Sequence, residues 1–235
     1  MPLEQNTPNQ SGEPAAIFDL DGTLITAHVW QCLVRYQVRQ RINLLPALAY
    51  PAIHYPLYPL ARVGLLDVGA FRRIWAERMP WLVVGMSVER AQRLFDDLVR
   101  EALLPTVRNE VLLELRQHQE RYHEVILLSG TFEPLLAAFA KAIGVAHAAG
   151  TRLRVSNGHY TGQGLAPLCM GVGKVTRLQQ YLAEAGIDVD WPDSYAYADS
   201  ISDAPVLALV GHPVVVAPDE QLRQHAHRPG WRILE

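Results

Sequence analysis

The stretch IFDLDGTL, residues 17–24, is an apolar run that ends in two aspartates, Asp19 and Asp21, followed at once by Gly22. Side chains two apart on a strand face the same side, so the two carboxylates are expected to point together while Leu20 turns to the core. Gly22 permits a tight turn, and Thr23 is expected to cap the next segment. Two neighbouring carboxylates repel each other unless a cation lies nearby. The stretch therefore predicts a buried strand with a charged site at its carboxyl end.

The composition narrows the class of protein. The chain has 235 residues, of which 49% are hydrophobic, which suits one large domain or a domain with a substantial insertion. The formal charge of -3 and the lack of a long basic run argue against a nucleic-acid partner. Only two cysteines are present, Cys32 and Cys169, far apart, so neither a disulfide framework nor a zinc site is indicated. A reducing, cytoplasmic location is expected, and residues 1–13 are predicted to be a flexible leader without a secretory signal.

Strands and helices are predicted to alternate along the chain. Short apolar runs that end in polar or turn residues, typical of buried parallel strands, occupy 15–20, 124–129, 194–199 and 212–217. Helices are expected over 133–143, 174–185, 204–210 and 220–227. This alternation predicts an α/β fold with a doubly wound, Rossmann-like core and a mostly parallel sheet. Between the first two runs the pattern becomes helical, so residues 27–102 are assigned to an inserted helical cap, and residues 14–26 and 103–235 to the core.

Polar side chains gather where the predicted strands end. Asp19 and Asp21 end the first run, Ser129 ends the second, and Asp199 ends the third, with Asp203 close behind it. Ligands of open α/β sheets bind beyond these carboxyl ends. Four carboxylates without a converging Cys or His favour a hard cation, and Mg2+ is the expected cofactor.

Phosphate-binding groups distinguish this site from a structural calcium site. The SGT sequence, residues 129–131, is expected to supply a hydroxyl and turn amides ahead of a helix, which together form an anion cradle. Lys174, near the start of its own predicted helix, would supply a positive charge. Carboxylates, a metal, a lysine and an anion cradle together predict phosphoryl transfer.

Four blocks in order, FDLDGT, LLSGT, GKVTRL and ADSISD, resemble the haloacid dehalogenase-like hydrolase superfamily. The resemblance is to the phosphoserine-phosphatase-like branch, which carries a helical cap after the first block, and the tail GHPVVVAPDEQLRQHAHRPGW extends it. Two departures are SGT, where relatives often have another small residue after the serine, and ADSISD in place of the commoner GDG form.

The resemblance implies a role for each of these residues. Asp19 would be the nucleophile that forms an aspartyl-phosphate, and Asp21 the acid that protonates the leaving oxygen and later deprotonates water. Phosphate would be bound by Lys174, by Ser129 and by the backbone amides around Gly130 and Thr131. Mg2+ would be bound by Asp19, the backbone carbonyl of Asp21 and Asp199, with Asp203 supporting the metal or orienting Lys174.

These residues predict a magnesium-dependent phosphomonoester hydrolase that acts on a small phosphorylated metabolite. Three alternatives stay open: a lipid-phosphate phosphatase of the lysophosphatidic-acid type, a non-catalytic binder of a phosphorylated ligand, and a phosphotransferase. In the cap, seven candidate contacts belong to types expected on any helical surface, so none is assigned; they are Trp30, Arg35, Arg39, Tyr50, Arg72, Arg73 and Trp75.

The lipid alternative depends on residues 44–61, which contain no charged residue. Prolines at 46, 51, 56 and 59 argue against a membrane-spanning helix and favour an irregular surface over one regular amphipathic helix. The stretch either packs the cap against the core or makes a weak contact with a membrane or lipid tail.

Overall fold

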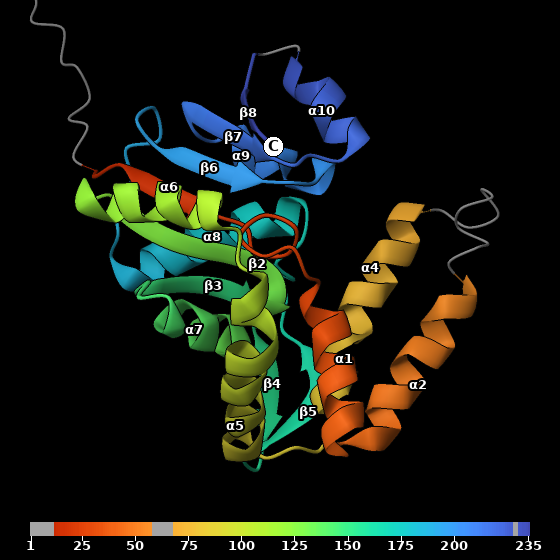
Figure 1. Ribbon diagram of the computed structural model, residues 1–235. Helices are drawn as coiled ribbons and strands as arrows, with labels where there is room; N and C mark the ends of the chain where they lie inside the picture. Colours follow the sequence, from red (N-terminus) through yellow and green to blue (C-terminus); the bar gives the residue numbers. More distant parts are fainter. Residues whose placement is uncertain (1–11, 58–67, 228–229) are drawn as a thin grey trace, which may run out of the picture.

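The structure is a computed structural model that describes residues 12–57, 68–227 and 230–235 (Figure 1). Its main sheet has six strands in the order β3-β2-β1-β6-β7-β8, and every neighbouring pair is parallel. The strands are β1 (Ala15–Phe18), β2 (Glu124–Phe132), β3 (His147–Thr151), β6 (Tyr195–Ala198), β7 (His212–Val216) and β8 (Arg232–Leu234). The four predicted strands are confirmed. β3 and β8 were not predicted, because HAAGT and RIL lack a long apolar run.

Both faces of the sheet are buried, as a doubly wound fold requires. In β1, Ala16 and Phe18 belong to one hydrophobic cluster, and Ala15 and Ile17 belong to the other. Side chains from α6 (Asn109–Glu120) and α7 (Glu133–Ala142) enter the first cluster. Side chains from α8 (Val172–Ala185), α9 (Ala204–Leu207) and α10 (Glu220–His227) enter the second. The predicted Rossmann-like core is thereby confirmed.

The sheet order places one edge of β1 at a topological switch point. The chain proceeds outward from β1 through β2 to β3, and then returns to the other side of β1 with β6. Loops that leave β1 and β6 therefore diverge at their carboxyl ends, and a crevice opens between them. Asp19 directly follows β1, and Asp199 directly follows β6.

The inserted segment is helical in its described part. It contains α1 (Val29–Gln40), α2 (Leu44–His54), η1 (Tyr55–Leu57), α4 (Val68–Arg78), η2 (Met79–Val83) and α5 (Val88–Leu98). A hairpin of β4 (Leu153–Ser156) and β5 (His159–Gly164) lies beside these helices and away from the main sheet (Figure 1). Its turn, Asn157-Gly158, has positive φ at both residues, which suits a two-residue hairpin. The division into leader, core and cap stays a prediction, and this hairpin lies with the cap helices although it is encoded after them.

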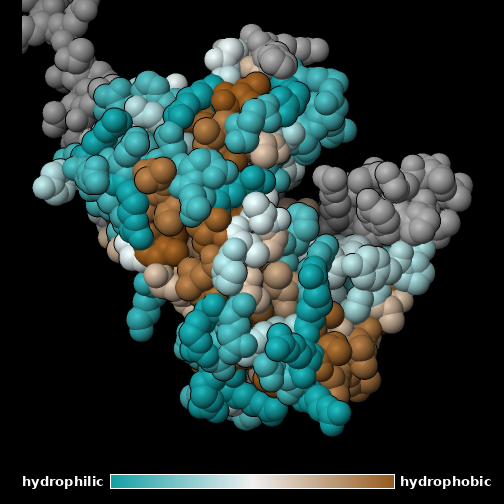
Figure 2. All heavy atoms as spheres, viewed as in Figure 1, coloured by the Kyte–Doolittle hydropathy of each residue, from teal (hydrophilic) through white to brown (hydrophobic). Residues whose placement is uncertain are grey.

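The expectation of an irregular surface over 44–61 is wrong for residues 44–54, which form the regular helix α2. Pro46 lies in the first turn, where a backbone N–H has no partner within the helix, so its missing donor costs little. Residues 58–61 lie outside the described residues. α2 buries Ala47, Tyr50 and His54 and exposes Leu45 and Leu48. Figure 2 shows an apolar patch at the lower right, where α2 lies in the same view of Figure 1. Among the described residues, no helix is both long and apolar enough to span a bilayer.

Candidate active site

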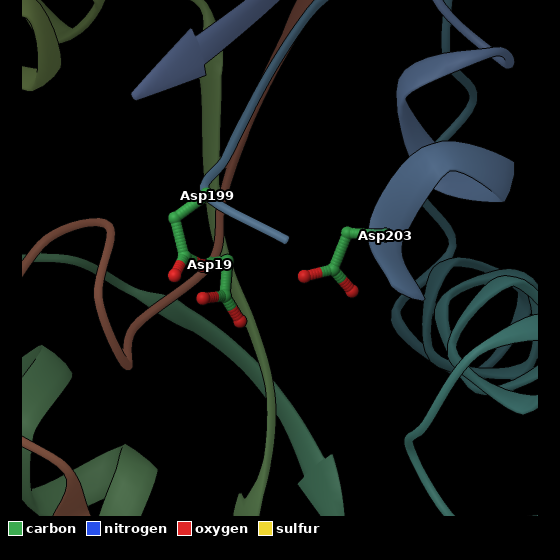
Figure 3. A group of neighbouring side chains, drawn as sticks. All are labelled: Asp19, Asp199 and Asp203. Atoms are coloured by element: carbon green, nitrogen blue, oxygen red, sulfur yellow. The ribbon is translucent and has the colours of Figure 1, made fainter. Parts of the chain in front are cut away.

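Three aspartates converge at the switch point although they come from distant parts of the chain. Asp19 follows β1, Asp199 follows β6, and Asp203 ends η5 (Ile201–Asp203). Their carboxylates face one another, with one oxygen of each within 4.8 Å of the others (Figure 3). Asp19 and Asp203 are buried, and Asp199 is partly buried. A cluster of carboxylate oxygens alone suits a hard divalent cation.

Lys174 neutralises part of this charge. The third residue of α8, it is 4% exposed, and its Nζ donates to Asp19 Oδ1 at 2.6 Å and to Asp203 Oδ1 at 2.8 Å. Burial alone lowers the pKa of Lys174, but the two carboxylates outweigh burial and raise it above its ordinary value. The lysine therefore remains an ammonium and bridges two acids.

The aspartates still carry excess negative charge. Burial raises the pKa of Asp19 well above its ordinary value, although Lys174 opposes the shift. Burial, and then the charge of Asp203, raises the pKa of Asp199 to about 6. A raised pKa means that nearby positive charge does not fully stabilise the ionised carboxylate. A bound divalent cation would supply the missing positive charge.

Gly22 and Thr23 fit tightly around Asp199. Gly22 has φ of +82°, and a Cβ at this position would lie 2.2 Å from Asp199 Oδ2, so only glycine fits. Thr23 is fully buried, and its Oγ1 donates to Asp199 Oδ1 at 3.2 Å. The expectation that Thr23 caps the next segment is therefore wrong, because its hydroxyl points back into the site. This contact with Asp199, 176 positions along the chain, could not be read from the local motif.

Asp21 lines the same cavity as Asp19 but directs its carboxylate elsewhere. Its Oδ1 accepts a hydrogen bond from the backbone N–H of Val29, the first residue of α1, at 2.5 Å. Its side chain is not part of the carboxylate cluster, which leaves only its backbone carbonyl to serve the predicted metal site. Burial raises the pKa of Asp21, and the Val29 N–H opposes the shift.

The SGT sequence has a different local structure from the one predicted. Residues Ser129, Gly130 and Thr131 lie within β2, not in a turn, and helix α7 begins only at Glu133. The register between β2 and β3 shifts over this segment, which lets the strand bend. Ser129 Oγ accepts a hydrogen bond from Thr131 N at 3.2 Å, and the buried Thr131 Oγ1 has no hydrogen-bond partner among the described residues. All three residues line the cavity beside the carboxylate cluster.

The cavity has a volume of about 680 Å³ and extends from the carboxylate cluster to the cap. Its cap-side lining includes His28, Trp30, Gln31, Tyr55, Trp75 and Met79. Among the seven cap residues left unassigned, Trp30 and Trp75 line it. Tyr50 is buried, with its hydroxyl donating to the Trp75 carbonyl at 2.9 Å. Arg35 and Arg39 line a separate cavity, Arg73 is exposed, and the side chain of Arg72 lies outside the described structure.

Comparisons with known proteins agree with this arrangement. The family model described as haloacid dehalogenase-like hydrolase matches residues 16–208. A histidinol-phosphatase from Neisseria meningitidis is 31% identical over 93% of this chain and 97% of its own length. The phosphoserine phosphatase SerB1 of Mycobacterium tuberculosis is 27% identical over 94% of this chain and 70% of its own length.

Two solved structures share the fold. A protein of unknown function from Bordetella pertussis has a TM-score of 0.80 at 25% identity, with 96% of this chain and 99% of that chain covered. A substrate-bound phosphoserine phosphatase has a TM-score of 0.62 at 16% identity, over 95% and 93% of the two chains. The chain therefore belongs to the haloacid dehalogenase-like hydrolases and is a phosphatase of that family.

Proposed function

We propose that the protein hydrolyses small phosphomonoesters with Mg2+ through an aspartyl-phosphate on Asp19. The observation that carries the proposal is the buried Asp19, paired with Lys174 and facing Asp199 and Asp203 at the switch point of the sheet. The family membership and the retention of both Asp19 and Asp21 favour an enzyme over a non-catalytic binder.

Two residue groups would bind the phosphoryl group. Lys174 would contribute its ammonium, and β2 would contribute the Ser129 hydroxyl and the backbone amides around Gly130 and Thr131. Mg2+ would be held by Asp19, Asp199 and the backbone carbonyl of Asp21, with Asp203 adjacent, and would neutralise charge on the phosphoryl oxygens. The oxygen-only donor set fits this ion.

Asp19 would perform the first step as a nucleophile. A carboxylate oxygen of Asp19 bonds to phosphorus while the bond from phosphorus to the substrate alcohol oxygen breaks. Asp21 transfers a proton to that leaving oxygen. In the second step a water loses its proton to Asp21, its oxygen bonds to phosphorus, and the bond to Asp19 breaks, which releases phosphate.

The position of Asp21 suits this proton transfer. Its Oδ1 accepts from Val29 N, so an added proton resides on Oδ2, while Asp21 as a whole lines the cavity. Its raised pKa keeps the protonated form accessible nearer to neutral pH than for an exposed aspartate.

Acid quench of the enzyme during turnover of a labelled phosphomonoester tests the proposal. The label is expected on the peptide that contains Asp19, and Asp19→Asn should carry none. Label on Ser129 instead, or turnover by Asp19→Asn near the wild-type rate, would contradict the mechanism. Release of inorganic phosphate with water as the sole acceptor would decide against a phosphotransferase.

A lipid phosphate is the second candidate substrate class, and the exposed apolar side of α2 favours it. Sedimentation with anionic liposomes and a comparison of lysophosphatidic acid with phosphoserine test this candidate. Absence of vesicle binding together with faster turnover of phosphoserine would exclude it.

A further inference from the structure

We propose that the substrate alcohol carries a positively charged nitrogen that binds against an aromatic wall formed by Trp30, Tyr55 and Trp75. The inference rests on the proposed function, because it concerns the part of the phosphomonoester that leaves. It names a substrate class, organic-cation alcohols, and the side chains that select it.

The proposed acid locates the leaving group. Because Asp21 would protonate the leaving oxygen, the rest of the alcohol must extend from a point beside Asp21. The Asp21 carboxylate accepts a hydrogen bond from the backbone N–H of Val29 at the amino terminus of α1, and Trp30 is the next residue. The leaving group therefore lies along the first turn of α1, where the cap side of the cavity begins.

Three aromatic rings form the wall at that place. The Trp30 and Trp75 ring centroids are 5.1 Å apart, and each lies 5.9 Å from that of Tyr55. The Trp75 ring is edge to face with the rings of Trp30 and Tyr55, at 68° and 83°, and the Trp30 and Tyr55 rings are tilted by 54°. All three line the cavity. The negative face of a Trp or Tyr ring attracts a cation within about 6 Å of its centroid.

The net charge around the cavity also favours a cationic leaving group. The described side chains that line it include four carboxylates, Asp19, Asp21, Asp199 and Asp203, against one ammonium, that of Lys174. A phosphate dianion and Mg2+ would cancel each other, so the site retains excess negative charge even when Asp21 is protonated. A cationic leaving group is attracted by this field, and a carboxylate-bearing one is repelled. An aromatic wall alone would also accept an alkyl group, but the field favours the cation.

A matched pair of substrates tests the charge. Phosphocholine and 3,3-dimethylbutyl phosphate have nearly the same shape, and only the first has a cationic nitrogen. We expect kcat/KM to be at least about tenfold higher for phosphocholine, and 2-phosphoglycolate, which adds a carboxylate, to be the poorest of the three. Equal or faster turnover of the neutral ester, or a preference for 2-phosphoglycolate, would overturn the inference.

Variants test the wall. Trp30→Leu and Trp75→Leu keep an apolar side chain but remove the π face. Each should lower kcat/KM for phosphocholine about five- to thirtyfold more than for 3,3-dimethylbutyl phosphate. Trp81→Leu is the control, because Trp81 lies in η2 of the same cap and is not among the cavity-lining residues. An unchanged selectivity ratio in both wall variants, with circular dichroism spectra like that of the wild type, would overturn the assignment.

Hydrolysis of p-nitrophenyl phosphate distinguishes a failure of the proposed function from a failure of the inference about the cationic substrate. If it is hydrolysed by the wild type and not by Asp19→Asn, the proposed function stands, and the ester comparison alone decides the inference. If no ester is hydrolysed in the presence of Mg2+, the proposed function fails, and the inference fails with it.

Discussion

Replacing Asp19 with Asn is expected to abolish turnover and, in the metal-free protein, to raise the melting temperature. An amide cannot act as the nucleophile, so phosphate release should fall to background. The stability gain follows from the charges around Asp19, which is only 8% exposed. Active-site groups arranged for chemistry commonly reduce stability in this way.

The size of the expected change in stability can be worked out from the distances between Asp19 and the charged groups around it. Carboxylate oxygens within 4.8 Å of one another imply repulsions of about 3.5 kcal/mol or more from each of Asp199 and Asp203, at an effective dielectric constant of about 20. On the same scale, the 2.6 Å contact with Lys174 gives an attraction of about 6 kcal/mol. The repulsion from the two aspartates and the attraction to Lys174 nearly cancel. The free energy that Asp19 loses when it is removed from water is therefore not recovered, in keeping with its raised pKa. The amide of the Asp19→Asn variant keeps an acceptor for Lys174, and the free energy of unfolding should rise by about 1 kcal/mol or more.

Thermal unfolding in a chelating buffer measures the effect, with a rise of about 2–4 °C expected for each kcal/mol in a chain of this size. Asp193→Asn is the matched control, because Asp193 is exposed and the change in net charge is the same. Since the folded-state pKa of Asp19 is raised, its ionisation destabilises the fold at neutral pH and has no effect below about pH 4. The advantage of Asp19→Asn should therefore be largest near pH 7 and disappear in acid. A lower melting temperature than that of the wild type at pH 7 would refute the electrostatic reasoning, and turnover within a few-fold of wild type would refute the nucleophile.

Four further outcomes are expected. Asp21→Asn should slow formation of the phospho-enzyme about a hundredfold to ten-thousandfold for an alkyl phosphate and much less for p-nitrophenyl phosphate; equal losses in rapid-quench experiments would exclude Asp21 as the acid. Gly22→Ala should abolish activity by displacing Asp199, whereas Gly85→Ala, at a similar φ of +75° with open space around it, should only lower the melting temperature. Chelation should stop phosphate release, and added Mg2+ should restore it and raise the melting temperature; activity indifferent to a chelator would remove the metal from the mechanism. Burial, and then the charge of a neighbouring histidine, lowers the pKa of His118 to about 4, so its contribution to stability is complete above about pH 6.5 and is lost as the pH falls toward 4. Urea unfolding should show the wild type losing about 2 kcal/mol relative to His118→Phe between pH 7.5 and pH 5, and parallel pH curves would contradict this.

Much of the core could be predicted because its signals are local. Apolar runs that end in polar residues identified β1, β2, β6 and β7, and parallel pairing brings the carboxyl ends of such strands to one edge. That rule is sufficient to predict that Asp19 and Asp199 meet across 180 positions of chain. Lys174 was expected to supply the positive charge of the site, but the resemblance to a known family was needed to support that role, because a lysine in the first turn of a helix has no signal of its own.

The predictions that depended on isolated local motifs were weaker. SGT reads as a turn, but pairing with β3 keeps it in a strand that bends. Thr23 resembles a helix cap, but burial against Asp199 gives its hydroxyl a different partner. Pro46 and Pro51 read as helix breakers, but the first-turn position of Pro46 and the packing of Tyr50 into the cap let α2 form. Tertiary contacts outweigh propensities of this size.

Local patterns of residue types are sufficient to predict the fold class, the edge of the sheet where the site lies and the acidic residues that gather there, because strand periodicity and parallel topology follow from the order of residue types. The partners of those groups follow from long-range packing. Asp21 accepts a hydrogen bond from the first residue of α1, and Lys174 bridges Asp19 and Asp203. The rings of Trp30 and Trp75 pack together in one aromatic wall. Such contacts join residues far apart in the chain, and they depend on how helices of the cap pack over the sheet, for which no local pattern in the sequence carries a signal.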